Sequence, residues 1–113
     1  MLTIQALRDW GANTDEGLSR CMNNEAFYLR LVGMLKNDQH FEQLETALAA
    51  GDTAAGFEAA HALKGVLANL ALTPALTPVS AITELLRARQ PVTDPALMDE
   101  ARSQMARLRE LLA

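Results

Sequence analysis

The chain has 113 residues, 50% of them hydrophobic, and a formal net charge of -4. This length suits one domain with a modest core, and the acidic charge argues against binding to nucleic-acid phosphates. No apolar run approaches the roughly 20 residues of a membrane-spanning helix, and the N-terminal segment lacks the features of a secretory signal. We therefore expect one cytoplasmic domain over residues 1–113 that binds neither nucleic acid nor membrane.

The residue types favour an all-α fold. Aromatic residues make up only 4% of the chain, so leucine, alanine and methionine must fill the core. Leucine and alanine favour helices, whereas the β-branched and aromatic residues typical of strands are sparse. The one cysteine, Cys21, excludes an internal disulfide, fits a reducing compartment and is expected to be a small core residue.

Two short helices are predicted in residues 1–23. Thr3 and Gly11 fit the start and the end of the first, which we expect to cover one end of the core. Asn13, followed three residues later by Glu16, resembles a capping box that opens the second. The apolar side chains that these helices would present are Ile4, Leu7, Trp10, Leu18, Cys21 and Met22.

Residues 24–113 are predicted to form the bundle itself. The sequence leaves open whether residues 24–50 make one bent helix or two, because Asp38 fits either a cap or an exposed turn. The apolar stripe of this segment is Tyr28, Leu31, Val32, Leu35, Phe41, Leu44 and Leu48. After Gly51, a central helix is expected from Asp52 or Thr53 to about Leu72.

Two further helices are marked by Thr-Pro and Asp-Pro pairs. A threonine cap followed by proline occurs at residues 73–74 and 77–78, so the next helix begins at one of these pairs and ends by Gln90, before Pro91. Asp94-Pro95 opens a last helix with the apolar stripe Leu97, Ala101, Met105, Leu108 and Leu112. These patterns predict an antiparallel four-helix bundle with short additional N-terminal helices.

The central helix has two contrasting faces. On a helical wheel, an apolar arc of about 100° is predicted to face the interior, and it contains Leu63, Val66, Leu67 and Leu70. His61 lies about 160° from the centre of that arc and should therefore point into solvent. Its neighbours on the outer face are Phe57, Lys64, Gly65 and Ala68.

The residues around His61 predict phosphoryl transfer. Glycine inside a helix costs about 1 kcal/mol relative to alanine, so Gly65 is best explained if another molecule must approach the imidazole closely. Lys64 is a mobile point charge suited to a phosphoryl group, which carries about two negative charges at neutral pH. Imidazole is a competent nucleophile in that pH range.

The chain lacks the parts that a kinase needs. It has no Gly-rich phosphate cradle and no carboxylate cluster that would suit magnesium. We therefore expect a phosphoryl carrier rather than an enzyme, with no cofactor or metal bound by this chain. The remaining catalytic apparatus would come from a partner.

The run HALKG at residues 61–65, with Asn69 eight residues after the histidine, resembles the motif of histidine-containing phosphotransfer (HPt) domains. These domains act in multistep two-component phosphorelays, and the resemblance extends from about Asn24 through most of the chain. It implies that His61 accepts a phosphoryl group from a receiver-domain aspartate and passes it to another. Lys64 would lie near the phosphoryl group, and Gly65 would leave room for the receiver.

The same resemblance implies the partners. These would be receiver domains of a response regulator or a hybrid histidine kinase, which would supply Mg²⁺ and most catalytic groups. Val66 and Leu67 stand where the family commonly has small or polar residues, and Ala71 stands where glycine is frequent. The wheel places Val66 and Leu67 toward the core, so we expect these departures to alter packing more than chemistry.

Three functions remain open at this point: a phosphocarrier, a non-phosphorylated helical adaptor, and a structural or dimerisation bundle. Phe57, Ala68 and Asn69 are the predicted docking residues, although Phe57 fits the edge of the core equally well. His40 is expected to be a plain surface residue, and the absence of close ligand spacing argues against a zinc site. We expect a monomer.

Overall fold

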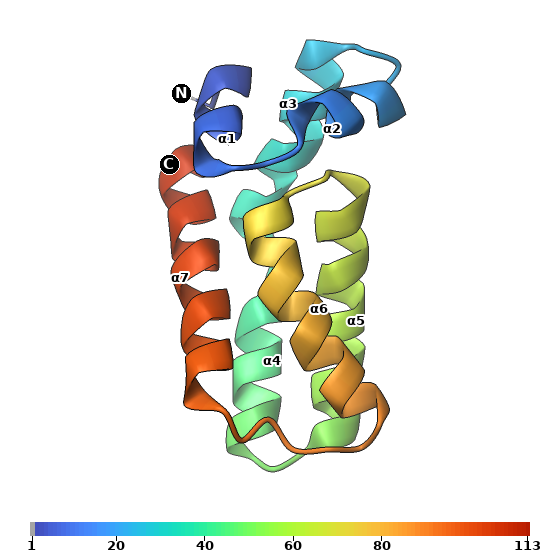
Figure 1. Cartoon of the computed structure of the whole chain (residues 1–113), viewed down its shortest axis with the longest axis vertical. Helices are drawn as coiled ribbons and strands as arrows, with labels where there is room; N and C mark the ends of the chain where they lie inside the picture. Colours follow the sequence, from blue (N-terminus) through green and yellow to red (C-terminus); the bar gives the residue numbers. More distant parts are fainter. Residues whose placement is uncertain (1) are drawn as a thin grey trace.

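The computed structural model describes residues 2–113, and every regular element in that range is helical. In chain order the elements are α1 (Ile4–Trp10), α2 (Thr14–Arg20), α3 (Glu25–Gly33), the 3-10 helix η1 (Met34–Asn37), α4 (His40–Ala49), α5 (Thr53–Asn69), α6 (Thr73–Arg87) and α7 (Pro95–Leu112). Helices α4 to α7 run along the long axis as an up-and-down bundle, and α1 and α2 lie across one end (Figure 1). The predicted all-α bundle with additional short helices is confirmed.

The bundle consists of α4, α5, α6 and α7. Helix α5 packs against α4 and α6, and α6 packs against α7. Ion pairs connect α7 to α4, including one of 2.9 Å between Arg102 Nη2 and Glu45 Oε2. Burial of apolar side chains from all four helices is the main source of stability, and the fully buried ones include Leu44, Leu63, Leu67, Ile82 and Leu108.

The first half of α5 packs especially closely against its neighbours. Ala59 and Ala60 are buried, as is Gly56. A Cβ atom at Gly56 would lie 3.3 Å from Leu48 Cδ2 and 3.5 Å from Leu86 Cδ1. The small residues therefore allow α4 and α6 to approach the helix that carries His61.

The N-terminal helices form largely as predicted. The Thr3 hydroxyl accepts a hydrogen bond from Ala6 N at 3.0 Å, and Gly11 ends α1 with a φ of 113°. Trp10 Nε1 donates to Gln104 Oε1 at 2.9 Å, which holds α1 against α7 at the end of the bundle. The expectation that Met22 contributes to an apolar face is wrong: its φ is 56° in the turn after α2, and it is 86% exposed.

The segment 24–50 is two helices rather than one bent helix. Helix α3 ends at Gly33, η1 follows, and α4 begins at His40. Asp38 Oδ1 accepts a hydrogen bond from His40 N at 2.9 Å, so this carboxylate satisfies a backbone donor at the start of α4.

Helix α5 ends earlier than predicted, whereas α6 begins at the first Thr-Pro pair and ends before Gln90, as predicted. Helix α5 ends at Asn69 rather than at Leu72, because Ala71 adopts a left-handed φ of 56° and Leu72 becomes the N-cap of α6. Neither threonine hydroxyl caps α6: Thr73 is already its first residue, and Pro78 lies inside the helix. A left-handed backbone conformation favours glycine. This preference explains why glycine is frequent at the position of Ala71 in the family that the sequence resembles.

The structure places Val66 at the edge of the core and confirms the expected start of α7. The side chain of Val66 packs against the core as the helical wheel predicts, but unlike Leu63 and Leu67 it is only partly buried and also lines a surface groove. Helix α7 begins as predicted, because the Asp94 side chain accepts a hydrogen bond from Ala96 N at 3.0 Å and Pro95 follows.

Candidate functional site

His61 lies in the middle of α5 and is exposed, as the helical wheel predicts. The helix begins at Thr53, where the Asp52 side chain accepts a hydrogen bond from Ala55 N at 3.0 Å. Leu63 and Leu67 anchor the opposite face, because both are fully buried in the core. Because Leu63 and Leu67 are four residues apart, they lie on one face of α5 and fix how the helix is rotated about its axis. This rotation directs His61 outward.

Phe57 contacts the imidazole directly. The two ring centroids are 5.4 Å apart and the rings are inclined by 15°, so they stack. Phe57 is itself partly buried against the core, and the Arg87 guanidinium carbon lies 5.1 Å from its ring centroid. The phenyl ring therefore restricts the orientation of His61, a role that the sequence did not reveal.

Lys64 is part of a charged cluster rather than a free cation. Its Nζ donates to Glu84 Oε1 at 3.0 Å, and Arg87 Nε donates to Glu84 Oε2 at 3.2 Å. The hydrogen bond from Lys64, together with the positive charge of Arg87, lowers the pKa of Glu84 below its ordinary value. Sequence reasoning missed Glu84 and Arg87. Their spacing of three residues within α6 indicates that they can pair with each other, but not that they lie beside Lys64.

Gly65 leaves open space on the outer face. A Cβ atom built at this residue would meet no heavy atom within 4 Å. Neither the core nor a neighbouring helix therefore requires a glycine here. The open surface one turn from His61 is consistent with close approach of another molecule.

The remaining predicted docking residues differ in their surroundings. The Ala68 carbonyl accepts a hydrogen bond from Arg20 Nη1, so the N-terminal helices reach the last turn of α5. Asn69 is exposed and lines a groove of about 440 Å³ between η1 and the end of α5. Met34 lies on the same groove and is 66% exposed.

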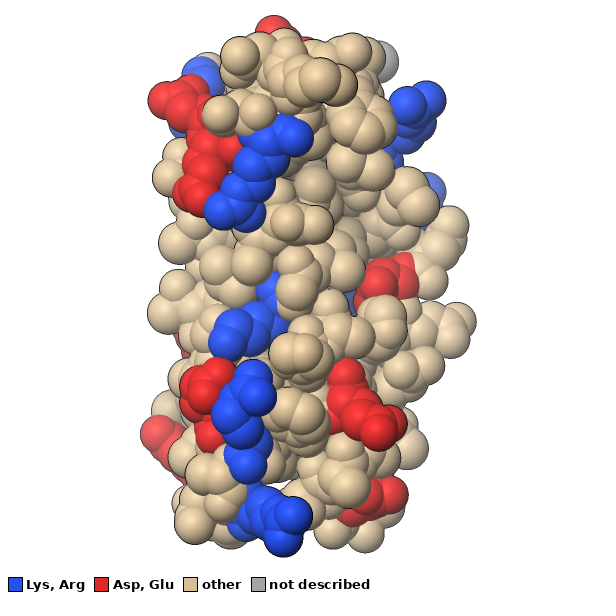
Figure 2. All heavy atoms as spheres, turned by 90° about the vertical axis from the view of Figure 1, so that its right-hand side faces the viewer, with Lys and Arg blue, Asp and Glu red and all other residues tan. Residues whose placement is uncertain are grey.

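Basic side chains form a column along the α5 side of the molecule, with acidic side chains beside them (Figure 2). Near the predicted site, Lys64 and Arg87 both pair with Glu84. This cluster of two cations and one carboxylate has an excess of one positive charge, although the whole chain has a net charge of -4. Such a local field favours an anionic group at His61.

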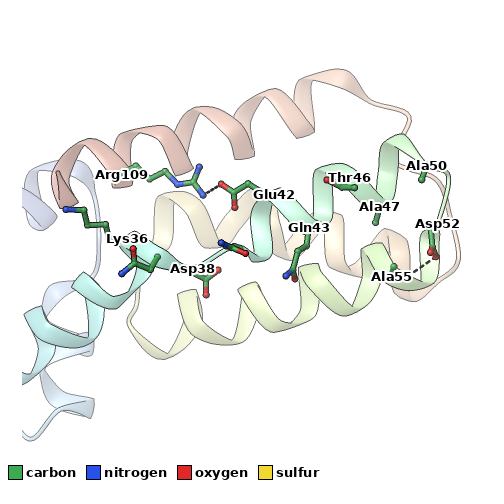
Figure 3. A pocket seen from close by; sticks show the side chains of 12 residues that line it. Lys36, Asp38, Glu42, Gln43, Thr46, Ala47, Ala50, Asp52, Ala55 and Arg109 are labelled. Atoms are coloured by element: carbon green, nitrogen blue, oxygen red, sulfur yellow. Dashed lines mark hydrogen bonds and ion pairs between the residues drawn. The ribbon is translucent and has the colours of Figure 1, made fainter.

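A larger cavity lies away from His61. It has a volume of about 910 Å³ and follows α4 from η1 to the start of α5 (Figure 3). Its lining includes Asp38, Gln43, Asp52 and Arg109, and it contains none of the predicted site residues. Because phosphoryl transfer between two proteins requires an exposed acceptor, we assign the candidate site to the outer face of α5 rather than to this cavity.

The other residues considered for metal binding are not brought together. Cys21 is buried, as predicted, at the end of α2. His40 contacts Asp38 instead, with Nδ1 2.9 Å from Oδ2. Over residues 2–113, no three histidine, cysteine, aspartate or glutamate side chains gather in a way that could hold a metal ion. In the same range, no helix has the length and apolar character needed to cross a membrane.

Comparison with known proteins gives one match. The family model described as the Hpt domain matches residues 35–111, which covers more than half of the chain and includes most of η1 and all of α4, α5 and α6. Searches of curated proteins and of solved structures gave no match. The match contains the HALKG run of residues 61–65. The chain therefore belongs to the Hpt domain family, whose members carry phosphoryl groups in two-component signalling and interact with receiver domains.

Proposed function

We propose that His61 accepts a phosphoryl group from an aspartate of one receiver domain and passes it to an aspartate of another. The observation that carries the proposal is the exposed imidazole of His61, which lies one turn from the open surface at Gly65. The ring stacks on Phe57 and is thus partly oriented before a partner arrives. Such orientation reduces the entropy that must be lost during transfer.

The transfer is a substitution at phosphorus. The unprotonated ring nitrogen of neutral His61 attacks the phosphorus, a P–N bond forms, and the P–O bond to the receiver aspartate breaks. The aspartate leaves as a carboxylate, and the other ring nitrogen can release its proton to solvent. Lys64 would move toward the phosphoryl oxygens and stabilise their negative charge. Passage to a second receiver is the reverse of this step.

The partner would complete the site. The receiver would bring Mg²⁺ and most catalytic groups, while this chain supplies the nucleophile, a nearby cation and an open surface. Phe57, Ala68 and Asn69 would border the docked receiver, because they lie on the same side of α5 as His61 or at its exposed end. We expect this chain to work in the cytoplasm and as a monomer.

The test is phosphoryl transfer from a phosphorylated receiver in the presence of Mg²⁺. Wild-type protein should acquire acid-labile, alkali-stable phosphate, and His61→Gln should acquire none. His40→Gln is the matched control, since His40 is the only other histidine, and it should label like the wild type. Label that persists in His61→Gln would contradict the proposal.

The groove beside Met34 gives a second function a specific basis. An exposed methionine beside partly buried apolar residues suits protein binding without phosphorylation. A receiver that binds the wild type and His61→Gln equally, without labelling either, would favour this adaptor function. Self-association that buries Phe57 and Ala68 would favour a structural bundle instead.

A further inference from the structure

Glu84 binds two cations close to the residues around the candidate phosphoacceptor: Lys64, three residues after His61, and Arg87, which lies over Phe57. Its Oε1 accepts from Lys64 and its Oε2 from Arg87, at 3.0 Å and 3.2 Å. We refer to these three side chains as the Glu84 bridge. It connects α5 to α6, because Lys64 lies in α5 and the other two residues lie in α6.

The Glu84 bridge is linked to His61 in two ways. Lys64 lies three residues after His61, so the two side chains are neighbours on one helix surface. Arg87 lies over the Phe57 ring, and that ring stacks on the imidazole. A change in the charge carried by His61 will therefore be felt by both cations of the bridge.

Phosphorylation of His61 changes which negative group attracts Lys64 more strongly. Before transfer, the Lys64 ammonium and the Arg87 guanidinium share one carboxylate. A phosphoryl group adds about two negative charges next to Lys64, so it attracts this ammonium more strongly than a single carboxylate does. The long, flexible stem of Lys64 allows it to turn toward His61.

When Lys64 moves away, the Glu84 carboxylate does not become a buried, unpaired charge. The Glu84 side chain is 55% exposed, so water can solvate the freed oxygen. Its other oxygen keeps the hydrogen bond from Arg87. The exchange of partners by Lys64 thus requires no buried, unpaired charge.

We propose that Glu84 is a positioning residue that competes with the phosphoryl group on His61 for Lys64, and thereby favours transfer of that group to a receiver. This inference rests on the proposed function of His61 and adds a residue that sets the transfer equilibrium. The carboxylate stabilises the unphosphorylated chain by occupying Lys64, and it repels the phosphoryl dianion. Both effects make the phosphorylated chain a better donor.

The experiment measures the equilibrium distribution of phosphoryl groups between this chain and a receiver. Glu84→Gln keeps the size of the side chain and removes its charge. The equilibrium constant for transfer from the receiver to His61 should therefore rise by roughly three- to tenfold at low salt. Glu45→Gln is the matched control. It also removes a carboxylate from an ion pair between helices, but that pair joins α4 to α7 and should leave the equilibrium unchanged.

A double-mutant cycle tests the role of Lys64. If Glu84 acts by competing for Lys64, Glu84→Gln should have a much smaller effect when Lys64 is already alanine. An equilibrium constant that Glu84→Gln leaves within twofold of the wild type would overturn the inference, as would an equal shift in the Lys64→Ala background. In either case labelled wild-type His61 would leave the proposed function intact. Absence of label on wild-type His61 would overturn both proposals.

Discussion

Two glycines mark two regions of the molecule with opposite packing. Gly65, on the outer face of α5, has no heavy atom within 4 Å of its Cβ position. Gly17, in α2, is covered by Tyr28, whose Cε1 atom would lie 2.5 Å from such a Cβ. We call the second region the α5 end junction, and it comprises Gly17, Tyr28 and Leu70.

The α5 end junction is held by one buried hydroxyl. Tyr28 is fully buried, and its hydroxyl donates to the Leu70 carbonyl at 2.7 Å. This bond satisfies a backbone acceptor just beyond the last turn of α5. Packing at the junction therefore favours glycine at residue 17, whereas nothing in the fold requires Gly65, and this difference supports a functional reason for Gly65.

The largest expected effect concerns the ionisation of Tyr28. Burial raises the pKa of Tyr28 to about 12 from 10.0, and the nearby Cys21 acts in the same direction. The folded state therefore keeps a proton that the unfolded state loses above pH 10, so this contribution to stability is fully present below pH 10 and is lost as pH rises toward 12. The shift corresponds to about 2 to 3 kcal/mol.

Absorbance at 295 nm can follow this titration, because Tyr28 is the only tyrosine. The midpoint should lie near pH 12 in the folded protein and near the ordinary value in urea. Denaturation at pH 9 and pH 11 should show the lower stability at pH 11. If Tyr28 titrated with a midpoint near pH 10 while the protein was still helical, its hydroxyl would not be buried at the α5 end junction.

The next effect is that of alanine at Gly17. The added methyl group would overlap the Tyr28 ring, which cannot move away without losing its hydrogen bond to Leu70. We expect a loss of about 2 kcal/mol in the free energy of unfolding, measured by urea denaturation. Gly33→Ala is the control, since its Cβ would meet nothing within 4 Å and stability should not fall. If the two substitutions lowered the free energy of unfolding equally, close packing at Gly17 would not explain the loss.

The smallest effect on stability, and one of opposite sign, is expected at Gly65. Gly65→Ala should stabilise the protein by up to about 1 kcal/mol, because alanine favours helices and its methyl group meets no neighbour. Gly65→Leu should keep the fold and slow transfer from a phosphorylated receiver by about tenfold, since the larger side chain hinders docking. Circular dichroism and single-turnover transfer measure the two properties. Unchanged transfer with leucine would remove the functional reason for this glycine.

Local signals in the sequence predicted much of the fold. Thr3, Gly11 and Asp94 act on backbone groups within a few residues, and each has the predicted role. The prediction failed where a distant contact decides the outcome. The end of α5 depends on the turn at Ala71 and on the packing of Tyr28, which lies 42 residues before Leu70 in the sequence.

The sequence by itself determined that His61 faces outward. Hydrogen bonds within a helix fix its period, so the buried positions of Leu63 and Leu67 also fix the direction of His61. Only the tertiary structure decided which groups surround that face. Lys64 meets Glu84 because α5 and α6 pack side by side with one particular rotation, and the sequence alone specifies neither their separation nor that rotation.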